Sequence, residues 1–143
     1  MTEEVKVNYV DHISIAVRDL KKAEEDFAKV FGWKTAGRYE DVSENIRVVY
    51  FKVGPTAVEL MEDMDGTGEV AKFIDKRGEG VMVVSFNVDN CMDSLRILQK
   101  NGAGVIDREP RLAEEFDRNF AFIHPKACHG VLTEVIDGKY NQA

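Results

Sequence analysis

The sequence has few cysteines, no long apolar run and fewer basic than acidic residues. Its two cysteines, Cys91 on an expected helix and Cys128 in an expected loop, do not make a disulfide framework or a paired-cysteine metal motif. Residues 1–4 are acidic in character and no long apolar run follows them, so we expect neither a signal peptide nor a membrane span. Together these features predict a cytoplasmic protein.

Charge and length narrow the function classes further. Acidic residues outnumber basic ones by 26 to 19, which gives a formal net charge of −7. Nucleic acid and anionic membranes attract cationic surfaces, so we expect neither as a partner, although small ligands stay open. The 143 residues, 44% of them hydrophobic, suffice for a sizeable core. We therefore expect a single domain over residues 1–143, without an interdomain linker.

One stretch near the N-terminus organises the rest of the chain. Over residues 11–18, apolar and more polar positions alternate with the period of two that is typical of a β-strand. His12 and Ser14 would then lie on the face opposite Ile13 and Ile15. Residues 19–31 change to a helical period, so a strand leads directly into a helix.

The same pattern returns later in the chain. Residues 81–88 form a second strand pattern, followed by a helical one that ends at Gly102, and Val83 stands 71 residues after His12. Residues 49–51 and 120–122 keep this offset, whereas 58–61 and 133–136 need four inserted residues. The repeat predicts two modules, about 8–62 and 80–137, each with one strand, one helix and three strands, and a connecting helix at 69–76.

The remaining strands follow from apolar runs and turn signals. In the first module we expect them to begin at 32–35 and then to span 46–53 and 56–61. In the second module we expect 103–106, 120–124 and 131–136, with residues 108–119 as a charged loop.

Alternation also selects three side chains that could carry chemistry. Glu59 and Glu134 each stand between residues expected to be buried, near the end of their modules, and His12 faces away from the first helix. A curved sheet could bring all three together, where a divalent cation would offset the cost of burying carboxylates. The alternative is that His12 is a structural residue and that both glutamates face solvent.

Five motifs are spread over nearly the whole chain: Val10–Val17, Val58–Met61, Ala71–Gly80, His124–Lys126 and Gly130–Glu134. Together they closely resemble the methylmalonyl-CoA epimerases, a family within the vicinal-oxygen-chelate superfamily of glyoxalases, bleomycin-resistance proteins and extradiol dioxygenases. It implies an α+β fold in which two tandem βαβββ modules form a cupped, mostly antiparallel eight-stranded sheet with the helices outside. It also implies a homodimer.

The resemblance further implies an isomerase that transfers a proton α to the thioester carbonyl of a small acyl-CoA. A divalent metal such as cobalt, manganese, nickel or zinc would neutralise the enolate, and two carboxylates would serve the two faces of the α carbon. Matching motifs place His12, Glu59 and Glu134 on metal-ligand positions. They also place Glu44 near the family's acidic residue, which makes Glu44 a candidate catalytic base with Glu134 as the second acid–base group.

Two departures from the family pattern concern this site. Val83 stands where the family has its second histidine ligand, and residues 112–118 replace a Gly-Ala-His-Gly loop. Three interpretations follow: His129 or a water completes the metal site; a related proton transfer acts on another acyl-CoA or 2-oxo acid; or the site is vestigial in a metal-free protein that binds a small carboxylate ligand or confers resistance. A glyoxalase-type lyase is a further alternative. Arg111 and Lys126 could contact a carboxylate or CoA phosphate, although exposed basic residues usually have no specific role.

Overall fold

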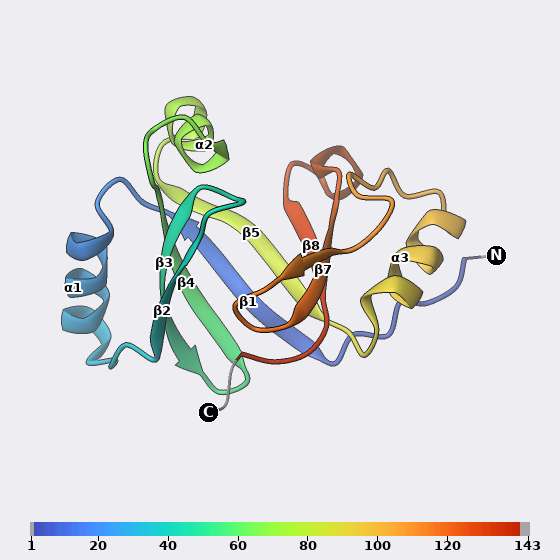
Figure 1. Cartoon of the computed structure of the whole chain (residues 1–143), viewed down its shortest axis with the longest axis horizontal. Helices are drawn as coiled ribbons and strands as arrows, with labels where there is room; N and C mark the ends of the chain where they lie inside the picture. The colour runs from blue at the N-terminus through green and yellow to red at the C-terminus, as the bar shows by residue number, and fades with distance from the viewer. Residues whose placement is uncertain (1, 141–143) are drawn as a thin grey trace. The chain divides into compact units, whose positions relative to one another are not determined.

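The computed structural model describes residues 2–140 and has the α+β class that the sequence predicts (Figure 1). Eight strands, three α-helices and one 3-10 turn lie in this part of the chain. They are β1 (Tyr9–Ala16), α1 (Leu20–Phe31), β2 (Gly37–Asp41), β3 (Ile46–Val53), β4 (Thr56–Asp63), α2 (Glu69–Arg77), β5 (Gly80–Asn87), α3 (Cys91–Lys100), β6 (Arg111–Ala113), β7 (Arg118–Ile123), the 3-10 turn η1 (Pro125–Cys128) and β8 (Leu132–Ile136).

The contacts of the chain divide it into two compact units. The first unit comprises residues 12–82, and the second combines the residues before His12 with those from Val83 onward. Both have one β-strand, one helix and three further strands in sequence, as the repeat predicts. No helix in residues 2–140 has the length and apolar character needed to cross a membrane.

In the first unit the strand order is β2-β3-β4-β1. β2–β3 and β3–β4 are antiparallel, and β1 runs parallel to β4 with Ser14 opposite Glu59. The register of β3 on β4 sets Tyr50 opposite the same glutamate. Because side chains opposite one another in a sheet share a face, Ser14, Glu59 and Tyr50 form one transverse row.

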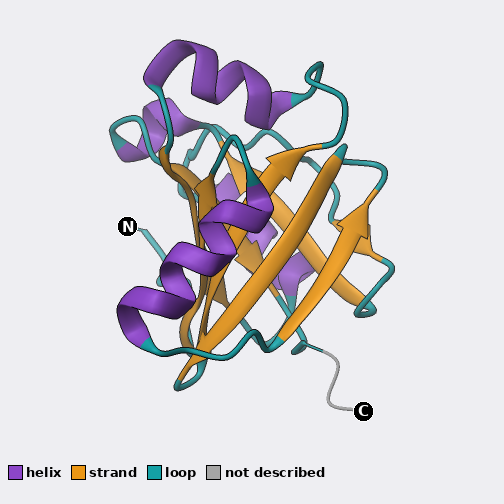
Figure 2. Ribbon diagram, turned by 90° about the vertical axis from the view of Figure 1, so that its left-hand side faces the viewer, coloured by secondary structure: helices purple, strands orange, loops and turns teal. Residues whose placement is uncertain are grey.

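Helix α1 covers one face of these strands (Figure 2). It begins where the Asp19 side chain accepts a hydrogen bond from the Lys22 N–H and ends at Gly32 in the left-handed conformation. Its apolar stripe, with Phe27 as the largest residue, packs on a buried cluster that includes Phe51 and Leu60. The helix therefore covers the face that alternates with His12 and Glu59.

Helix α2 covers part of the opposite face of the first unit. Its Val70 and Ile74 are buried against Ala16, Val48 and Met61. These three strand residues lie one row beyond Ser14 and Glu59 in the sheet register. An apolar patch under α2 thus adjoins the polar row on the same face.

The second unit repeats the arrangement with the order β5-β8-β7-β6. β5 runs parallel to β8, and the other two pairings are antiparallel. Helix α3 begins at Asn90, whose side chain accepts from the Asp93 N–H, and it packs Cys91 and Leu95 on Ala121 and Val135. In both units antiparallel pairings outnumber parallel ones, as expected.

Three local predictions were wrong. The second strand, expected to begin at 32–35, begins at Gly37 as β2 (Gly37–Asp41), because Trp33 stacks on Phe31 with ring centroids 4.2 Å apart instead of entering the sheet. Residues 103–106 form only an isolated bridge between Val105 and Ile123. The expected loop 108–119 contains β6 and the start of β7, since a short edge strand can be rich in charge.

The internal repeat also needs a correction of one residue. The register pairs Tyr50 with Glu59 and Phe122 with Glu134, so Tyr50 corresponds to Phe122 at an offset of 72 instead of 71. The second unit has one more residue between its first strand and this position. A slip of one residue would exchange the two faces of the strand.

Candidate active site

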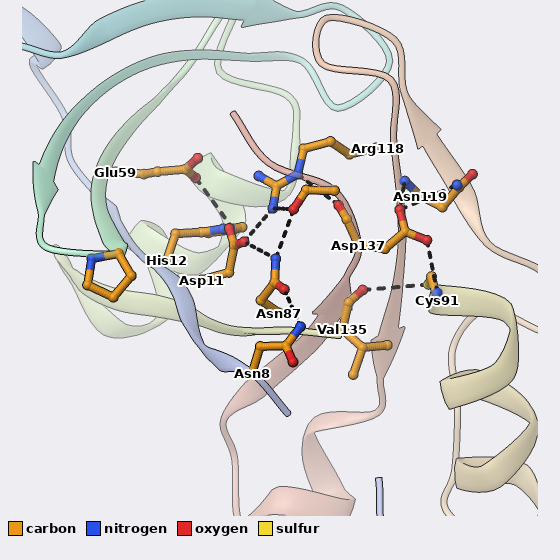
Figure 3. A network of polar contacts seen from close by, with 12 residues as sticks. Asn8, Asp11, His12, Glu59, Asn87, Cys91, Arg118, Asn119, Val135 and Asp137 are labelled. Carbon is orange, nitrogen blue, oxygen red and sulfur yellow. Dashed lines mark hydrogen bonds and ion pairs between the residues drawn. The ribbon is translucent and has the colours of Figure 1, made fainter. Parts of the chain in front are cut away.

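The structure brings two of the predicted residues together in the first unit. His12 on β1 and Glu59 on β4 are 6% and 3% exposed, and His12 Nε2 lies 3.8 Å from Glu59 Oε1 (Figure 3). Both side chains lie on the face away from α1, as the alternation predicts. A buried imidazole beside a carboxylate provides the donor types that bind divalent transition metals or that move protons.

Both oxygens of the Glu59 carboxylate accept hydrogen bonds. The Ser14 hydroxyl donates to Oε1 at 2.9 Å, and the Tyr39 hydroxyl donates to Oε2, also at 2.9 Å. Ser14 comes from the adjacent strand β1, whereas Tyr39 comes from β2, two strands away. The carboxylate is therefore oriented by donors from both sides.

Tyr50 completes the row but points away from Glu59. A Cβ on Gly37 would lie 2.5 Å from the Tyr50 hydroxyl oxygen, so the tip of this ring rests on the glycine backbone. Burial, and second the charge of Glu59, raise the pKa of Tyr50 above its ordinary value. Tyr50 thus stays a neutral phenol beside the carboxylate.

Glu44 lies in the turn between β2 and β3 and is half-buried. Its backbone N–H donates to Asp41 Oδ1 at 3.2 Å, and the next residue, Asn45, has a φ of 61°. The Asn45 side chain donates to the carboxylates of Asp63 and Asp65, which anchors the turn to the loop after β4. The backbone that carries Glu44 is therefore fixed from both ends.

In the second unit, Glu134 on β8 is 5% exposed and lies opposite Ser85 of β5 and Phe122 of β7. This row corresponds to Ser14, Glu59 and Tyr50 of the first unit. Val83, also buried, is two residues from Ser85 on the same face and offers no atom that binds a metal. Within residues 2–140, the buried Ser85 hydroxyl has no hydrogen-bond partner.

Two further predicted candidates lie at the edges of the second unit. The Arg111 guanidinium lies 5.3 Å from the centre of the Phe122 ring, and its Nε donates to Asp107 at 2.8 Å. His129 is exposed after η1, with a φ of 57° and its N–H bonded to the Pro125 carbonyl. Arg111 therefore belongs to the face that carries Glu134, and His129 serves a tight turn.

A buried polar network also lies in the second unit (Figure 3). Arg118 forms an ion pair with Asp11, and both side chains are almost fully buried. The Asn87 amide donates to Asp11 at 2.9 Å and to the Gly138 carbonyl at 3.0 Å, and Arg118 Nε donates to the Asp137 carbonyl. This network fixes the chain just after β8, the strand that carries Glu134.

With this geometry, the comparison with known proteins is informative. Residues 11–122 match the profile of the glyoxalase/bleomycin resistance protein/dioxygenase superfamily, and the chain belongs to this superfamily. This is the vicinal-oxygen-chelate superfamily that the sequence motifs resemble.

Individual relatives point to one branch of that superfamily. The mitochondrial methylmalonyl-CoA epimerase of Mus musculus is 28% identical over 131 residues, 91% of this chain and 73% of the mouse protein. An uncharacterized protein of Bacillus subtilis is 29% identical over 136 residues, 95% of this chain and 96% of that protein. A methylmalonyl-CoA epimerase solved with methylmalonyl-CoA and NH4+ superposes with a TM-score of 0.88 at 27% identity, covering 93% of this chain and 96% of that one.

Sequence reasoning found His12 and Glu59 but missed the residues that orient them. Ser14 follows His12 by two positions, so the alternation alone could have placed it on the same face. Tyr39 was hidden because the strand that carries it was expected earlier in the chain. The Asp11–Arg118 pair has no local signal, since its members are 107 residues apart.

Proposed function

We propose that this protein is an isomerase that moves a proton at the carbon α to the thioester carbonyl of a small acyl-CoA, with methylmalonyl-CoA as the reference substrate. The observation that carries the proposal is the buried pair of His12 and Glu59 at the positions where the epimerase motifs have metal ligands. The length and the fold similarity of the epimerase matches support it.

Proton transfer would use the two remaining carboxylates. Removing a proton from one face of the α carbon and returning one to the other face needs two acid–base groups, for which we propose Glu44 and Glu134. One carboxylate takes the α proton and leaves an enolate, and the second group donates the proton that forms the new C–H bond on the other face. Glu134 is buried, and Glu44 lies on an anchored turn, so each has a defined position within its own unit.

The residues present match a metal site only in part. His12, Glu59 and Glu134 would hold the metal if the epimerase pattern applies, and a divalent cation there would neutralise the enolate oxygen. Val83 supplies no ligand, and residues 2–140 contain no cluster of three or more His, Cys, Asp or Glu side chains arranged to hold a metal. We therefore assign every proton step to the chain's own carboxylates.

A second candidate function is favoured by Val83. An apolar, buried residue at this position suits a metal-free protein that binds a small acyl or carboxylate ligand without transforming it. In either case the partner is a small molecule, and a homodimer in solution stays a prediction that light scattering would test.

The decisive experiment follows the α proton of methylmalonyl-CoA in deuterated water by NMR. It is run with the purified protein, with added cobalt and with a chelator. We expect exchange in the wild type and a loss of about 10²–10⁴-fold in His12→Ala, the range associated with acid–base and electrostatic groups. His124→Ala, a change at an exposed histidine, is the control and should exchange normally.

The outcomes separate the two functions. Exchange that disappears with the chelator and returns with cobalt supports the metal-assisted reaction, and exchange that resists the chelator supports the carboxylates alone. Binding of the acyl-CoA without exchange would favour the metal-free binding protein. Neither exchange nor binding would contradict both candidates.

A further inference from the structure

The geometry points to Tyr39 as a positioning residue that holds the Glu59 carboxylate in front of His12. The inference deepens the proposed function and rests on it for its consequence in catalysis. The contact that carries it is the hydrogen bond from the Tyr39 hydroxyl to Glu59 Oε2 at 2.9 Å, on the oxygen opposite the one that Ser14 bonds. A carboxylate held at both oxygens cannot turn away from the imidazole without losing one donor.

Tyr39 reaches Glu59 from a different row of the sheet. The register sets Tyr39 opposite Val48, and Val48 opposite Met61, so its backbone belongs to the row next to that of Glu59. The long phenol therefore crosses diagonally over β3 to reach β4. Neighbouring strands are about 4.8 Å apart, so the contact spans two strand spacings and needs the full length of both the phenol and the glutamate side chain.

Gly37 and Tyr50 leave the room for this crossing. Gly37 is opposite Tyr50 in the register, and the tip of the Tyr50 ring occupies the space that a side chain at Gly37 would need. Tyr50 leans toward the edge strand while Tyr39 leans inward, with ring centroids 6.2 Å apart and planes at 58°. A side chain at Gly37 would push Tyr50 back against Tyr39 and Glu59.

Contacts at both faces and at the end of β2 hold the backbone that carries Tyr39 in place. On the other face of β2, Arg38 donates to both oxygens of Glu24 on α1, at 2.9 and 2.8 Å. At the end of β2, Asp41 accepts from the Ser43 hydroxyl and the Glu44 N–H. Tyr39 thus links Glu59 to the strand that leads into the Glu44 turn.

The chemical consequence concerns the orientation of Glu59. Hydrogen-bond donors behind a metal-binding or catalytic carboxylate set which of its oxygens faces the ligand, and their loss typically costs about 10–100-fold in affinity or activity. A residue that acts by positioning Glu59 should affect the chemical step more than substrate binding, so removal of the Tyr39 hydroxyl should lower kcat and leave KM nearly unchanged.

The test uses Tyr39→Phe, which removes only the hydroxyl, with Tyr9→Phe as the matched control. The protein has three histidines, so the ring signals of His12 can be identified by their loss in His12→Ala. At fixed pH and without metal, we expect Tyr39→Phe to shift the His12 signals, while those of the exposed His124 and His129 stay in place. We further expect cobalt binding, where the wild type shows it, to weaken by about 10–100-fold.

A second variant should disturb the hydrogen bond between Tyr39 and Glu59 while both residues keep all their atoms. Gly37→Ala should displace Tyr50 and shift the His12 signals in the same way, and a paired measurement of the melting temperature reports any loss of folding. Agreement between the two variants would support positioning by Tyr39.

Unchanged His12 signals in folded Tyr39→Phe, with normal kcat, would overturn the inference and leave the proposed function intact. A melting temperature that falls while the His12 signals and kcat stay constant would also overturn it, since the contact would then be purely structural. If the wild type neither binds cobalt nor exchanges the α proton, the proposed function fails, and the His12 signals still decide whether Tyr39 positions Glu59.

Discussion

The two units place different chemistry on equivalent positions. In the first unit Ser14 donates to Glu59 within their row, and Glu59 stands next to His12. In the second, Glu134 is flanked by Phe122, which has no hydroxyl, and the histidine position is Val83. Where the first unit has Tyr39, the second has Arg111, whose guanidinium lies over the Phe122 ring.

This difference shows how a duplicated scaffold can separate tasks. Strand order, parallel pairing and helix placement are the same in both units, because they depend on apolar periodicity. The polar residues on the opposite face are free to diverge. The first unit presents a carboxylate beside an imidazole, whereas the second presents a carboxylate in a row with a serine and a phenylalanine and has a buried polar network around Arg118.

The buried Arg118 is the polar residue of the second unit whose removal should destabilise the protein most. The equivalent position in the first unit is Ile46, an apolar residue. The substitution Arg118→Leu would leave the buried Asp11 carboxylate without its cation. We expect the free energy of unfolding to fall by about 3–5 kcal/mol, measured by urea denaturation. Arg38→Leu removes an arginine that is 63% exposed and should cost less than about 1 kcal/mol. Equal losses in the two variants would contradict this ranking.

A smaller effect is expected from making the units more alike. Val83→His restores the family's histidine in the second unit, and we expect cobalt affinity to rise at least about tenfold, measured by calorimetric titration. Val84→His places the same side chain on the opposite face and is the control. Affinity that rises equally in both variants would show that the added imidazole binds cobalt outside the proposed site.

The smallest effect that we expect is a pH-dependent contribution of Glu24, in the first unit, to the stability of the protein. The hydrogen bonds from Arg38, and to a lesser degree from Thr35, hold the pKa of Glu24 below its ordinary 4.5 although burial opposes them. Because the pKa is lower in the folded than in the unfolded state, ionised Glu24 stabilises the protein above pH 4.5. The protein loses this contribution as the pH falls through the lowered pKa. Glu24→Gln should therefore cost about 0.5 kcal/mol at neutral pH, and the difference from the wild type should vanish in acid. A difference that persists in acid would contradict the assignment.

The sequence predicted the parts of the fold that depend on periodicity. The strand at 46–53 was placed at its observed bounds, and both helices after the first strands were found from their apolar stripes. The alternation around His12 and Glu59 correctly put both on one face. These features are local, so a single stretch of sequence contains the needed information.

The remaining features depend on contacts that no single stretch contains. The bounds of β2 depend on partners elsewhere in the chain, because its Arg38 bonds to Glu24 on α1 and the whole strand pairs with β3. β6 has only three residues, and its one large apolar side chain, Leu112, is exposed. It therefore lacks the alternation of buried and exposed residues that marks a strand. The contact of Tyr39 with Glu59 requires the register of three strands, which a motif cannot supply.

The aromatic stack beside α1 has a consequence for how unfolding can be followed. Trp33 is the only tryptophan; it stacks on Phe31 and lies tilted against Phe51, so its fluorescence reports on the first unit alone. In the second unit, burial and nearby carboxylates raise the pKa of Cys91 to about 12, which keeps this thiol unreactive until its surroundings open. The first unit therefore contains an optical reporter and the second a buried-thiol reporter, distinct from the half-buried Cys128, and a denaturant series can reveal whether the two halves of the duplication unfold together.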